Sequence, residues 1–275
     1  MSLPLPSSLS PSKVSSFKDC ALAFRLSAID KLPEPPSAAA TKGTLVHRAL
    51  QLLFWDEEPG HRTLDAALEK LERAKAEMTT DPDFTGLELD GAQVAMFHDE
   101  ANSLVRNYFE LEDPNEVRVV GVELRLEARI GSLLLRGIID RLELDADGEL
   151  VITDYKTGRS PGANFELSRM GGVHFYAFLC EQVFGRRPAR IQLLHLAEPV
   201  AISLVPSEQS VRGLRNRTQA VWAAVERACE TEDFRPKVGK LCDWCAYKAY
   251  CPAFGGDLGA IPRPPVAAPL ALAAV

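Results

Sequence analysis

The chain has 275 residues and a formal net charge of −7 at pH 7, with 46% hydrophobic and 25% charged residues. This composition is ordinary for a globular protein, and its acidic balance argues against a generally basic nucleic-acid-binding protein. No apolar run approaches the ~20 residues that a membrane-spanning helix needs. The opening MSLPLPSSLSPSK lacks a basic start and a long apolar core, so we expect no secretory signal, no membrane partner and a cytoplasmic location.

The first part of the chain favours helices. Residues 1–11 are rich in Pro and Ser and are expected to be disordered, and a short helix is expected from Ser12. The loop KLPEPPSAAATK separates it from a helix over KGTLVHRALQLLFW, where apolar residues recur at helical spacing. Two further helices are predicted over residues 63–78 and 90–111, with the turn-rich TTDPDFTG between them.

The pattern then changes to that of strands. The alternation from Val120 to Ile130 predicts one strand, and LLLRGIIDRLEL and ELVITDYKTG predict two more, joined by the turn DADG. Helical spacing returns over residues 166–184 and 207–230, on either side of the strand-like runs ARIQLLHLAE and PVAISLV.

This order of elements predicts an α/β fold with a mixed central sheet flanked by helices. We expect a single domain over residues 12–254, between a disordered N-terminus and a disordered Ala/Pro-rich tail over residues 255–275.

The second and third predicted strands carry side chains that could hold a metal ion. Side chains alternate faces along a strand, so Asp154 and Lys156 point the same way while Tyr155 points the other way. If the two strands pair across the DADG turn, Asp140 can lie close to Asp154. Two carboxylates beside an ammonium group can hold a divalent cation and position a water. The alternative is a polar hairpin with a surface Asp–Lys pair.

The cysteines suggest a second metal site. Cys242, Cys245 and Cys251 form the pattern C-x2-C-x5-C, and in a cytoplasmic chain this clustering indicates a metal rather than disulfides. Three thiolates leave one tetrahedral position open, and thiolate chemistry alone does not distinguish zinc from iron. Cys180 and Cys229 lie outside this cluster, in apolar helix-like runs, and are expected to pack as small core residues.

The strand motifs resemble those of the PD-(D/E)xK nuclease superfamily and, within it, the RecB-like, CRISPR-adaptation-like iron–sulfur branch. The family's GxxD motif matches Gly137 to Asp140, and its D-x-K motif matches Asp154 to Lys156. The resemblance implies a restriction-endonuclease-like core with helical decoration on its N-terminal side.

The resemblance extends to the cysteines. In the iron–sulfur members, one N-terminal cysteine joins three near the C-terminus to hold a [4Fe-4S] cluster, and SSFKDCALAFRL resembles the N-terminal element. Zinc is the alternative occupant. Such a site would tie residue 20 to residue 242 and stabilise the fold by constraining the unfolded chain. The four implied ligands are Cys20, Cys242, Cys245 and Cys251.

Three further residues are candidates for the active site. His47 matches the histidine of a G-x-x-x-H context that lines the family's metal site, with a polar position on an amphipathic helix as the alternative. Tyr176 matches the tyrosine of a Q-x-x-x-Y motif that contacts DNA or orders the site, but Gly172 stands where the glutamine is expected. Glu123 could add a carboxylate, although exposed charge is the commoner explanation.

The activity that the resemblance implies is a Mg²⁺- or Mn²⁺-dependent deoxyribonuclease, with exonuclease action in DNA repair or recombination. Asp140, Asp154 and the Tyr155 carbonyl would hold the ion, with His47 completing the shell and Lys156 orienting the attacking water. The implied substrate is DNA, often single-stranded ends. The chain lacks the Walker-type motif G-x-x-x-x-G-K-[ST], so a helicase partner would be a separate protein.

Two other functions are open from the sequence. An inactive iron–sulfur DNA-docking subunit of a helicase–nuclease assembly would explain the acidic charge and the missing glutamine. A zinc-stapled protein whose carboxylates bind another phosphoester is the second alternative.

Basic and aromatic residues near the motifs have ordinary explanations as well. We interpret each arginine singly as solvated surface: Arg136, Arg141, Arg159 and Arg169. Aromatic side chains could stack the bases of single-stranded DNA, although each is more often part of a core. The candidates are Phe24, Trp55, Tyr176 and Trp244.

Overall fold

The computed structural model describes residues 2–159 and 173–262. At its centre lies a sheet of five strands in the order β1-β2-β3-β4-β5. Strands β3 and β4 pair in parallel and the other neighbours are antiparallel, so the sheet is mixed, as predicted. The strands are β1 (Arg118–Ile130), β2 (Leu133–Leu144), β3 (Leu150–Lys156), β4 (Arg190–His195) and β5 (Val200–Leu204).

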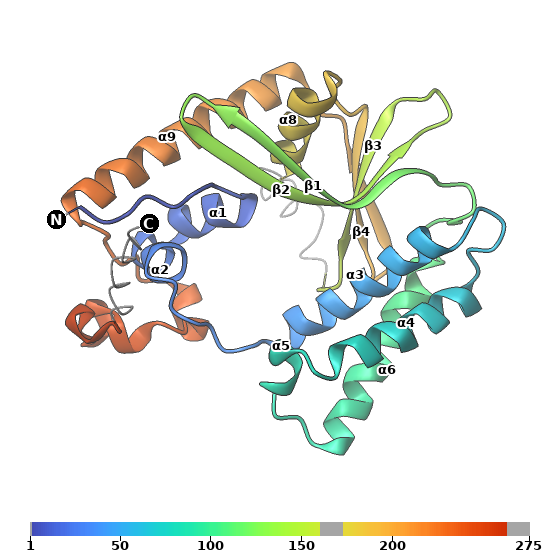
Figure 1. The fold of residues 1–275 in the computed structure, drawn as a ribbon, viewed down its shortest axis with the longest axis horizontal. Coiled ribbons are helices and arrows are strands. Elements are labelled where there is room, and N and C mark those ends of the chain that lie inside the picture. Colours follow the sequence, from blue (N-terminus) through green and yellow to red (C-terminus); the bar gives the residue numbers. More distant parts are fainter. Residues whose placement is uncertain (1, 160–172, 263–275) are drawn as a thin grey trace, which may run out of the picture.

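Helices cover both faces of the sheet (Figure 1). On one face, apolar strand residues pack with α8 and α9 around Phe178 and Val225, which we call the α9-side core. On the other face, α3, α4 and α6 pack around Leu50 and Tyr108, the α3-side core. The helices are α1 (Pro11–Asp19), α2 (Ala21–Phe24), α3 (Ala38–Asp56), α4 (Leu64–Met78), α5 (Pro82–Thr85), α6 (Gly91–Tyr108), α8 (Val173–Phe184) and α9 (Glu208–Thr231).

The predicted helices agree with the structure because capping residues begin them where the sequence indicated. Thr63 caps α4 by accepting from the Ala66 amide. Asp90 and Gln93 form a capping box at the start of α6, which satisfies amides that have no partner within the helix. Helix α3 starts at Ala38, earlier than expected, since the alanines before Lys42 are strong helix formers.

Near the middle of β1, in the hairpin of β1 and β2, the side chains change from packing against one core to packing against the other. Leu126 belongs to the α9-side core, whereas Val122 packs against the α3-side core. Glu123 lies at this change with a φ of 47°, a left-handed conformation that residues with a side chain rarely adopt. The register of the hairpin then sets Glu123 opposite Asp140.

The N-terminal segment differs from the expected disorder. Leu9 is fully buried, and its amide donates to the Leu134 carbonyl at 2.9 Å while its carbonyl accepts from the Arg136 amide at 2.9 Å. This pairing is available because β3 pairs only with the later part of β2, from Arg141 onward, and leaves the earlier edge of β2 open. The segment before α1 is therefore anchored to the edge of β2 at Leu9, and nearer its start the Leu3 amide donates to the Cys229 carbonyl on α9 at 3.0 Å.

The cysteine-rich region after α9 consists of short helical turns. They are Lys240–Trp244, Lys248–Tyr250, Pro252–Phe254 and Leu258–Ala260, and a π-helical turn Arg25–Ile29 follows α2. Residues 263–275 of the predicted tail, and Arg169 and Gly172, lie outside the described residues. A single domain over residues 12–254 stays a prediction.

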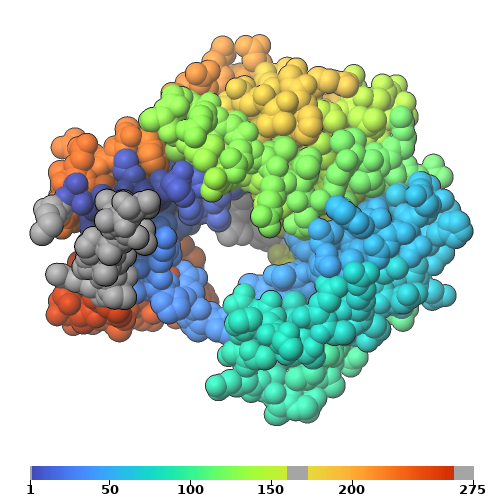
Figure 2. All heavy atoms as spheres, viewed as in Figure 1, coloured from blue at the N-terminus to red at the C-terminus, as the bar shows by residue number. Residues whose placement is uncertain are grey.

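The molecule has an opening near its middle in the space-filling view. Figure 2 shows it between the N-terminal segment in blue and the helices α3 to α5 in light blue and teal, below the green hairpin of β1 and β2. Within the described part of the chain, no helix is both long enough and apolar enough to cross a membrane.

Candidate metal centre and active site

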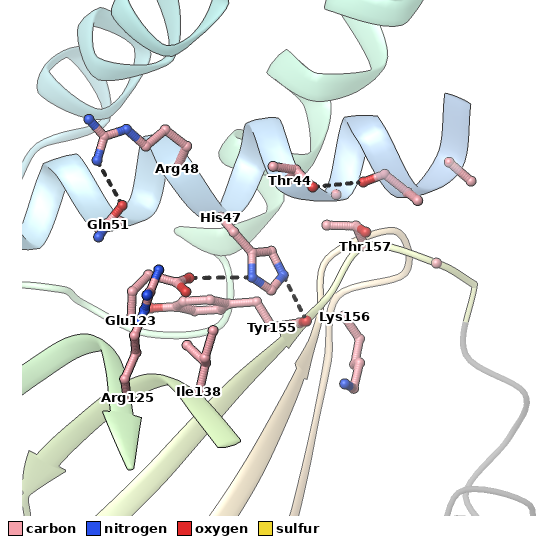
Figure 3. Close-up of a pocket in the computed structure, with 14 residues that line it drawn as sticks. Thr44, His47, Arg48, Gln51, Glu123, Arg125, Ile138, Tyr155, Lys156 and Thr157 are labelled. Atoms are coloured by element: carbon pink, nitrogen blue, oxygen red, sulfur yellow. Dashed lines mark hydrogen bonds and ion pairs between the residues drawn. The ribbon is translucent and has the colours of Figure 1, made fainter. Parts of the chain in front are cut away.

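Three side chains and one peptide unit meet where the sheet faces α3. The Tyr155 amide on β3 donates to Asp140 Oδ2 at 2.8 Å, and His47 Nε2 on α3 donates to the Tyr155 carbonyl at 3.1 Å. His47 Nδ1 lies 3.6 Å from Asp140 Oδ2 and 3.8 Å from Glu123 Oε1. Figure 3 shows His47 between Glu123 and the Tyr155 carbonyl.

This arrangement fits a divalent cation. Because a carbonyl oxygen only accepts, the Nε2 atom of His47 carries the proton, and in the neutral ring the Nδ1 lone pair faces the carboxylates. One ligand atom from each of His47, Glu123 and Asp140 lies within 4.8 Å of the others. Carboxylate oxygens suit Mg²⁺ or Mn²⁺, and an imidazole nitrogen beside them favours Mn²⁺ of the two.

Asp154 and Lys156 lie on the same side of β3, as the strand period predicts, and form a close ion pair. Within the described residues, Asp154 is not part of the group of three ligand atoms, but its negative charge acts on Asp140. The structure therefore brings together His47, Asp140 and the Tyr155 carbonyl, and it sets Asp154 beside Lys156 next to them.

Two motif glycines allow the close packing that forms this site. A Cβ on Gly43 would lie 3.0 Å from Thr157 Oγ1, so glycine lets α3 approach the end of β3 one turn before His47. A Cβ on Gly137 would lie 2.8 Å from Leu179 Cδ1 and 3.0 Å from Tyr176 Cε1. Glycine at this position lets α8 pack directly on β2 and holds the half-buried Tyr176 ring against the strand.

Burial and like charge dominate the electrostatics. Burial, and then the negative charge of Asp154, raise the pKa of Asp140 to about 7. Burial alone would lower the pKa of His47, but the negative charges of the neighbouring carboxylates Glu123, Asp140 and Asp154 raise it overall. Burial and the same carboxylates also raise the pKa of Tyr176. A bound dication would relieve the repulsion among these carboxylates.

The site opens into a cleft of about 710 Å³ between α3 and the ends of the strands. Its polar lining residues include His47, Arg48, Gln51, Glu123, Arg125 and Lys156. A cleft of this size has room for part of a substrate beside a metal ion.

A family model described as the PD-(D/E)XK nuclease superfamily matches residues 8–252 of the chain. The chain belongs to this superfamily. It therefore carries a nuclease domain, and the expected resemblance to the superfamily is confirmed, whereas the RecB-like iron–sulfur branch stays a prediction.

One solved structure and two phage proteins resemble this chain. A crystal structure from Eubacterium rectale, named provisionally as an exonuclease, covers 87% of each chain with a TM-score of 0.52 and 12% sequence identity, and it shows the same fold. The Gene 69 protein of Mycobacterium phage D29 is 28% identical over 178 residues, which are 58% of this chain and 65% of the phage protein. That of phage L5 is 28% identical over 136 residues, 48% and 44% of the two chains. The matches span less than two thirds of either phage protein.

Arg141 is the clearest error of the sequence analysis, which read it as solvated surface. It is fully buried behind the motif aspartate of the superfamily. Its guanidinium donates to the Tyr155 hydroxyl at 2.9 Å, to Glu112 Oε2 at 3.0 Å and to Thr153 Oγ1 at 3.1 Å, and it pairs closely with Glu143. Two carboxylates and neutral acceptors thus compensate one buried cation.

Glu123 is the residue whose importance the sequence analysis underestimated. Exposed charge was the commoner explanation, but Glu123 lies within ligand distance of His47 and Asp140. The pairing register that sets it opposite Asp140 follows from the hairpin, and that was the available signal. Its left-handed backbone, which turns it toward α3, has no signature in the residue types.

The four predicted cluster cysteines line one small pocket. It lies between the start of α2 and the short turns after α9, and it is formed in part by Cys20, Cys242, Cys245 and Cys251. None of the described cysteines forms a disulfide. Backbone amides point at two of the sulfurs: Lys237 N to Cys20 Sγ at 3.5 Å and Gly239 N to Cys242 Sγ at 3.4 Å. Amides in this position stabilise thiolates.

The remaining cysteines and aromatics divide between core and surface. Cys180 and Cys229 are buried, as expected, and burial raises the pKa of Cys180 to about 12. Phe24 is a core residue, but Trp55 is 73% exposed and Trp244 79% exposed, so the core explanation was wrong for both tryptophans.

Replacing Arg141 by Lys tests the buried network. Lysine keeps the charge but lacks the planar guanidinium group, so some of the surrounding acceptors lose their hydrogen-bond donor. The free energy of unfolding should fall by ~2–4 kcal/mol. Urea denaturation measures this. The control is Arg136→Lys, whose side chain forms an exposed pair with Glu127 and should change the stability by under ~0.5 kcal/mol. Equal effects of the two substitutions would contradict the structural importance of the network.

The raised pKa of Asp140 predicts a pH-dependent effect of Asp140→Asn in metal-free protein. The folded state binds this proton more tightly than the unfolded state, so the stabilising effect is complete below pH ~4 and is lost as pH rises through about 7. The variant should therefore match the parent near pH 4 and be more stable at pH 8, by on the order of 1 kcal/mol or more.

Urea denaturation in the presence of a chelator, repeated across this pH range, measures the difference. The control is Asp147→Asn in the exposed β2–β3 turn, which removes a carboxyl that is not part of the cation site. A stability difference for Asp140→Asn that is the same at every pH would show that this carboxyl does not titrate as described.

Proposed function

We propose that this protein is a Mg²⁺- or Mn²⁺-dependent deoxyribonuclease that acts as an exonuclease on DNA, with single-stranded ends as substrate, in repair or recombination. The observation that carries the proposal is the convergence of His47, Glu123 and Asp140 at one point beside the Asp154–Lys156 pair. Hydrolysis of a phosphodiester needs a metal ion that activates a water and a nearby positive charge, and this site offers candidate residues for both.

Asp140, Glu123 and His47 would hold the ion, with Asp154 as the further oxygen ligand predicted from the sequence. The Tyr155 carbonyl, which the sequence analysis also expected to bind the ion, is engaged by His47 Nε2 instead. When bound, the metal lowers the pKa of a water and neutralises charge on the phosphate oxygens. The Tyr155 carbonyl fixes the His47 ring so that Nδ1 faces the site.

Lys156 has the role of an electrostatic catalyst in this proposal. Its ammonium group is held by Asp154 and lies in the cleft wall, so it can donate to the attacking water or to a phosphate oxygen. Tyr176, packed against Gly137, would orient the carboxylates from the α8 side and contact the substrate.

The presence of every residue needed for chemistry favours an enzyme over an inactive docking subunit. A docking subunit has no need to keep a buried carboxylate pair beside a lysine, because that arrangement costs folding free energy. The exonuclease assignment is supported by the name of the Eubacterium rectale neighbour, which shares the fold. A helicase partner and a cytoplasmic location are part of the same proposal.

The four-cysteine pocket is proposed to hold a [4Fe-4S] cluster. The proposal rests on the four sulfurs that line one pocket and on the resemblance of their spacing to that of the iron–sulfur members, with zinc as the alternative occupant.

Lys156→Met should abolish metal-dependent cleavage, because it removes the cation that stabilises the transition state while leaving the carboxylates in place. We expect a loss of about 10²-fold or more in the cleavage rate. The assay follows end-labelled single- and double-stranded DNA with Mn²⁺ or Mg²⁺, and substrates with blocked ends separate exonuclease from endonuclease action. Lys42→Met, which removes a lysine paired with Glu100 on the helical side, serves as the control. Cleavage by Lys156→Met at the parent rate would refute the role of this lysine.

The cysteine pocket is tested on protein purified without oxygen. We expect a brown protein with broad visible absorption and about four iron atoms per chain. Cys245→Ser should lose iron and be less stable, whereas Cys180→Ala, which alters a buried cysteine outside the pocket, should keep the iron. A colourless protein with bound zinc would reject the iron–sulfur cluster and support zinc as the occupant.

A further inference from the structure

The cleft is longer than a metal site requires. Along α3 it is lined from Ala39 to Gln51, which corresponds to about 18 Å of helix at 1.5 Å per residue. His47 lies between these ends, so the cleft continues past the cation site in both directions. A chain of several nucleotides is long enough to fill it.

The two ends of the cleft differ in chemistry. Figure 3 shows Arg48, Gln51 and Arg125 on the same side of His47 as Glu123, and Thr44 and Thr157 on the side of Lys156. The first end offers two guanidinium groups and an amide, and the second offers hydroxyl groups and small residues. Among the described residues that line the cleft, guanidinium groups that could neutralise a further phosphate lie at the first end.

Arg125 is the cation at this end that the fold does not use. It is exposed on β1, and it makes no hydrogen bond or ion pair with any part of the chain that the structure describes. Arg125 lies on β1, the strand that also carries Glu123, and both side chains line the same cleft. A guanidinium beside a cluster of carboxylates, with no partner of its own, is available to an anionic ligand.

Arg48 and Gln51 form the opposite wall and are held in place. Arg48 Nε donates to Glu77 Oε2 at 2.7 Å, and Arg48 Nη1 donates to Gln51 Oε1 at 2.8 Å. Glu77 also accepts from Arg73 at 3.1 Å, and Arg73 in turn donates to Asp56 at 3.0 Å, so Arg48 belongs to an ion-pair network that fixes its side chain in the cleft wall. With its oxygen engaged by Arg48, Gln51 retains its NH₂ group as a donor.

We propose that Arg125, facing Arg48 and Gln51, forms a binding subsite for the phosphate that flanks the scissile phosphate on a single nucleic-acid strand. The proposal rests on the proposed nuclease function and deepens it, because it states at which end of the cleft the bound nucleic-acid strand continues. Guanidinium groups recognise phosphate through paired hydrogen bonds, which the acidic surroundings of the cation site cannot supply. A protein with a negative net charge would thus bind its anionic substrate through a locally positive site.

The test maps phosphate contacts by binding rather than by cleavage. Fluorescent single-stranded oligonucleotides, each with one phosphate replaced by a neutral methylphosphonate, are titrated with Lys156→Met protein in Mn²⁺, and anisotropy gives each Kd. We expect one position next to the scissile phosphate to weaken binding about tenfold, the size of one charge-assisted contact. In Lys156→Met/Arg125→Ala, unmodified DNA should bind about tenfold more weakly, and that position should lose its extra effect.

Arg129→Ala in the same background is the matched control, because Arg129 is exposed on the same strand but does not line the cleft. It should keep the full pattern of methylphosphonate effects. A pattern that survives Arg125→Ala unchanged, or an equal loss with Arg129→Ala, would overturn the subsite. Failure of the parent protein to cleave any DNA would instead reject the proposed function, and it would do so whatever the binding map shows.

Discussion

The structure depends on one buried cation. Arg141 holds the Tyr155 hydroxyl within the α3-side core, and the peptide unit of Tyr155 in turn holds Asp140 through its amide and His47 through its carbonyl. The position of the cation site is therefore fixed by a residue that never touches it. A buried guanidinium is tolerated only when its acceptors are complete, so Glu112 and Glu143 are part of the same constraint.

The sequence was most informative where local rules decide the structure. Strand period and the DADG turn were enough to predict that Asp140 would meet Asp154 and that Lys156 would share its side, since both follow from pairing geometry. The burial of Arg141 could not be read in the same way. Its partners come from the end of α6, from β2 and from β3, and only the folded chain brings these acceptors together.

Motif glycines illustrate how packing and chemistry share one pattern. Gly43 and Gly137 have no chemical role, yet each occupies a place where a Cβ would strike a neighbouring element. The superfamily motifs combine ligands with the residues that let the ligands approach one another. Glu123 lies outside such patterns because its position depends on backbone conformation, which the residue type does not encode.

The cysteine pocket joins parts of the chain that are made at very different times. Cys20 leaves the ribosome early, whereas its three companions follow α9, after every residue of the cation site. The pocket therefore lacks three of its four sulfurs until every residue of the cation site has been synthesised. Loading of that pocket, whatever its occupant, can be complete only after that point.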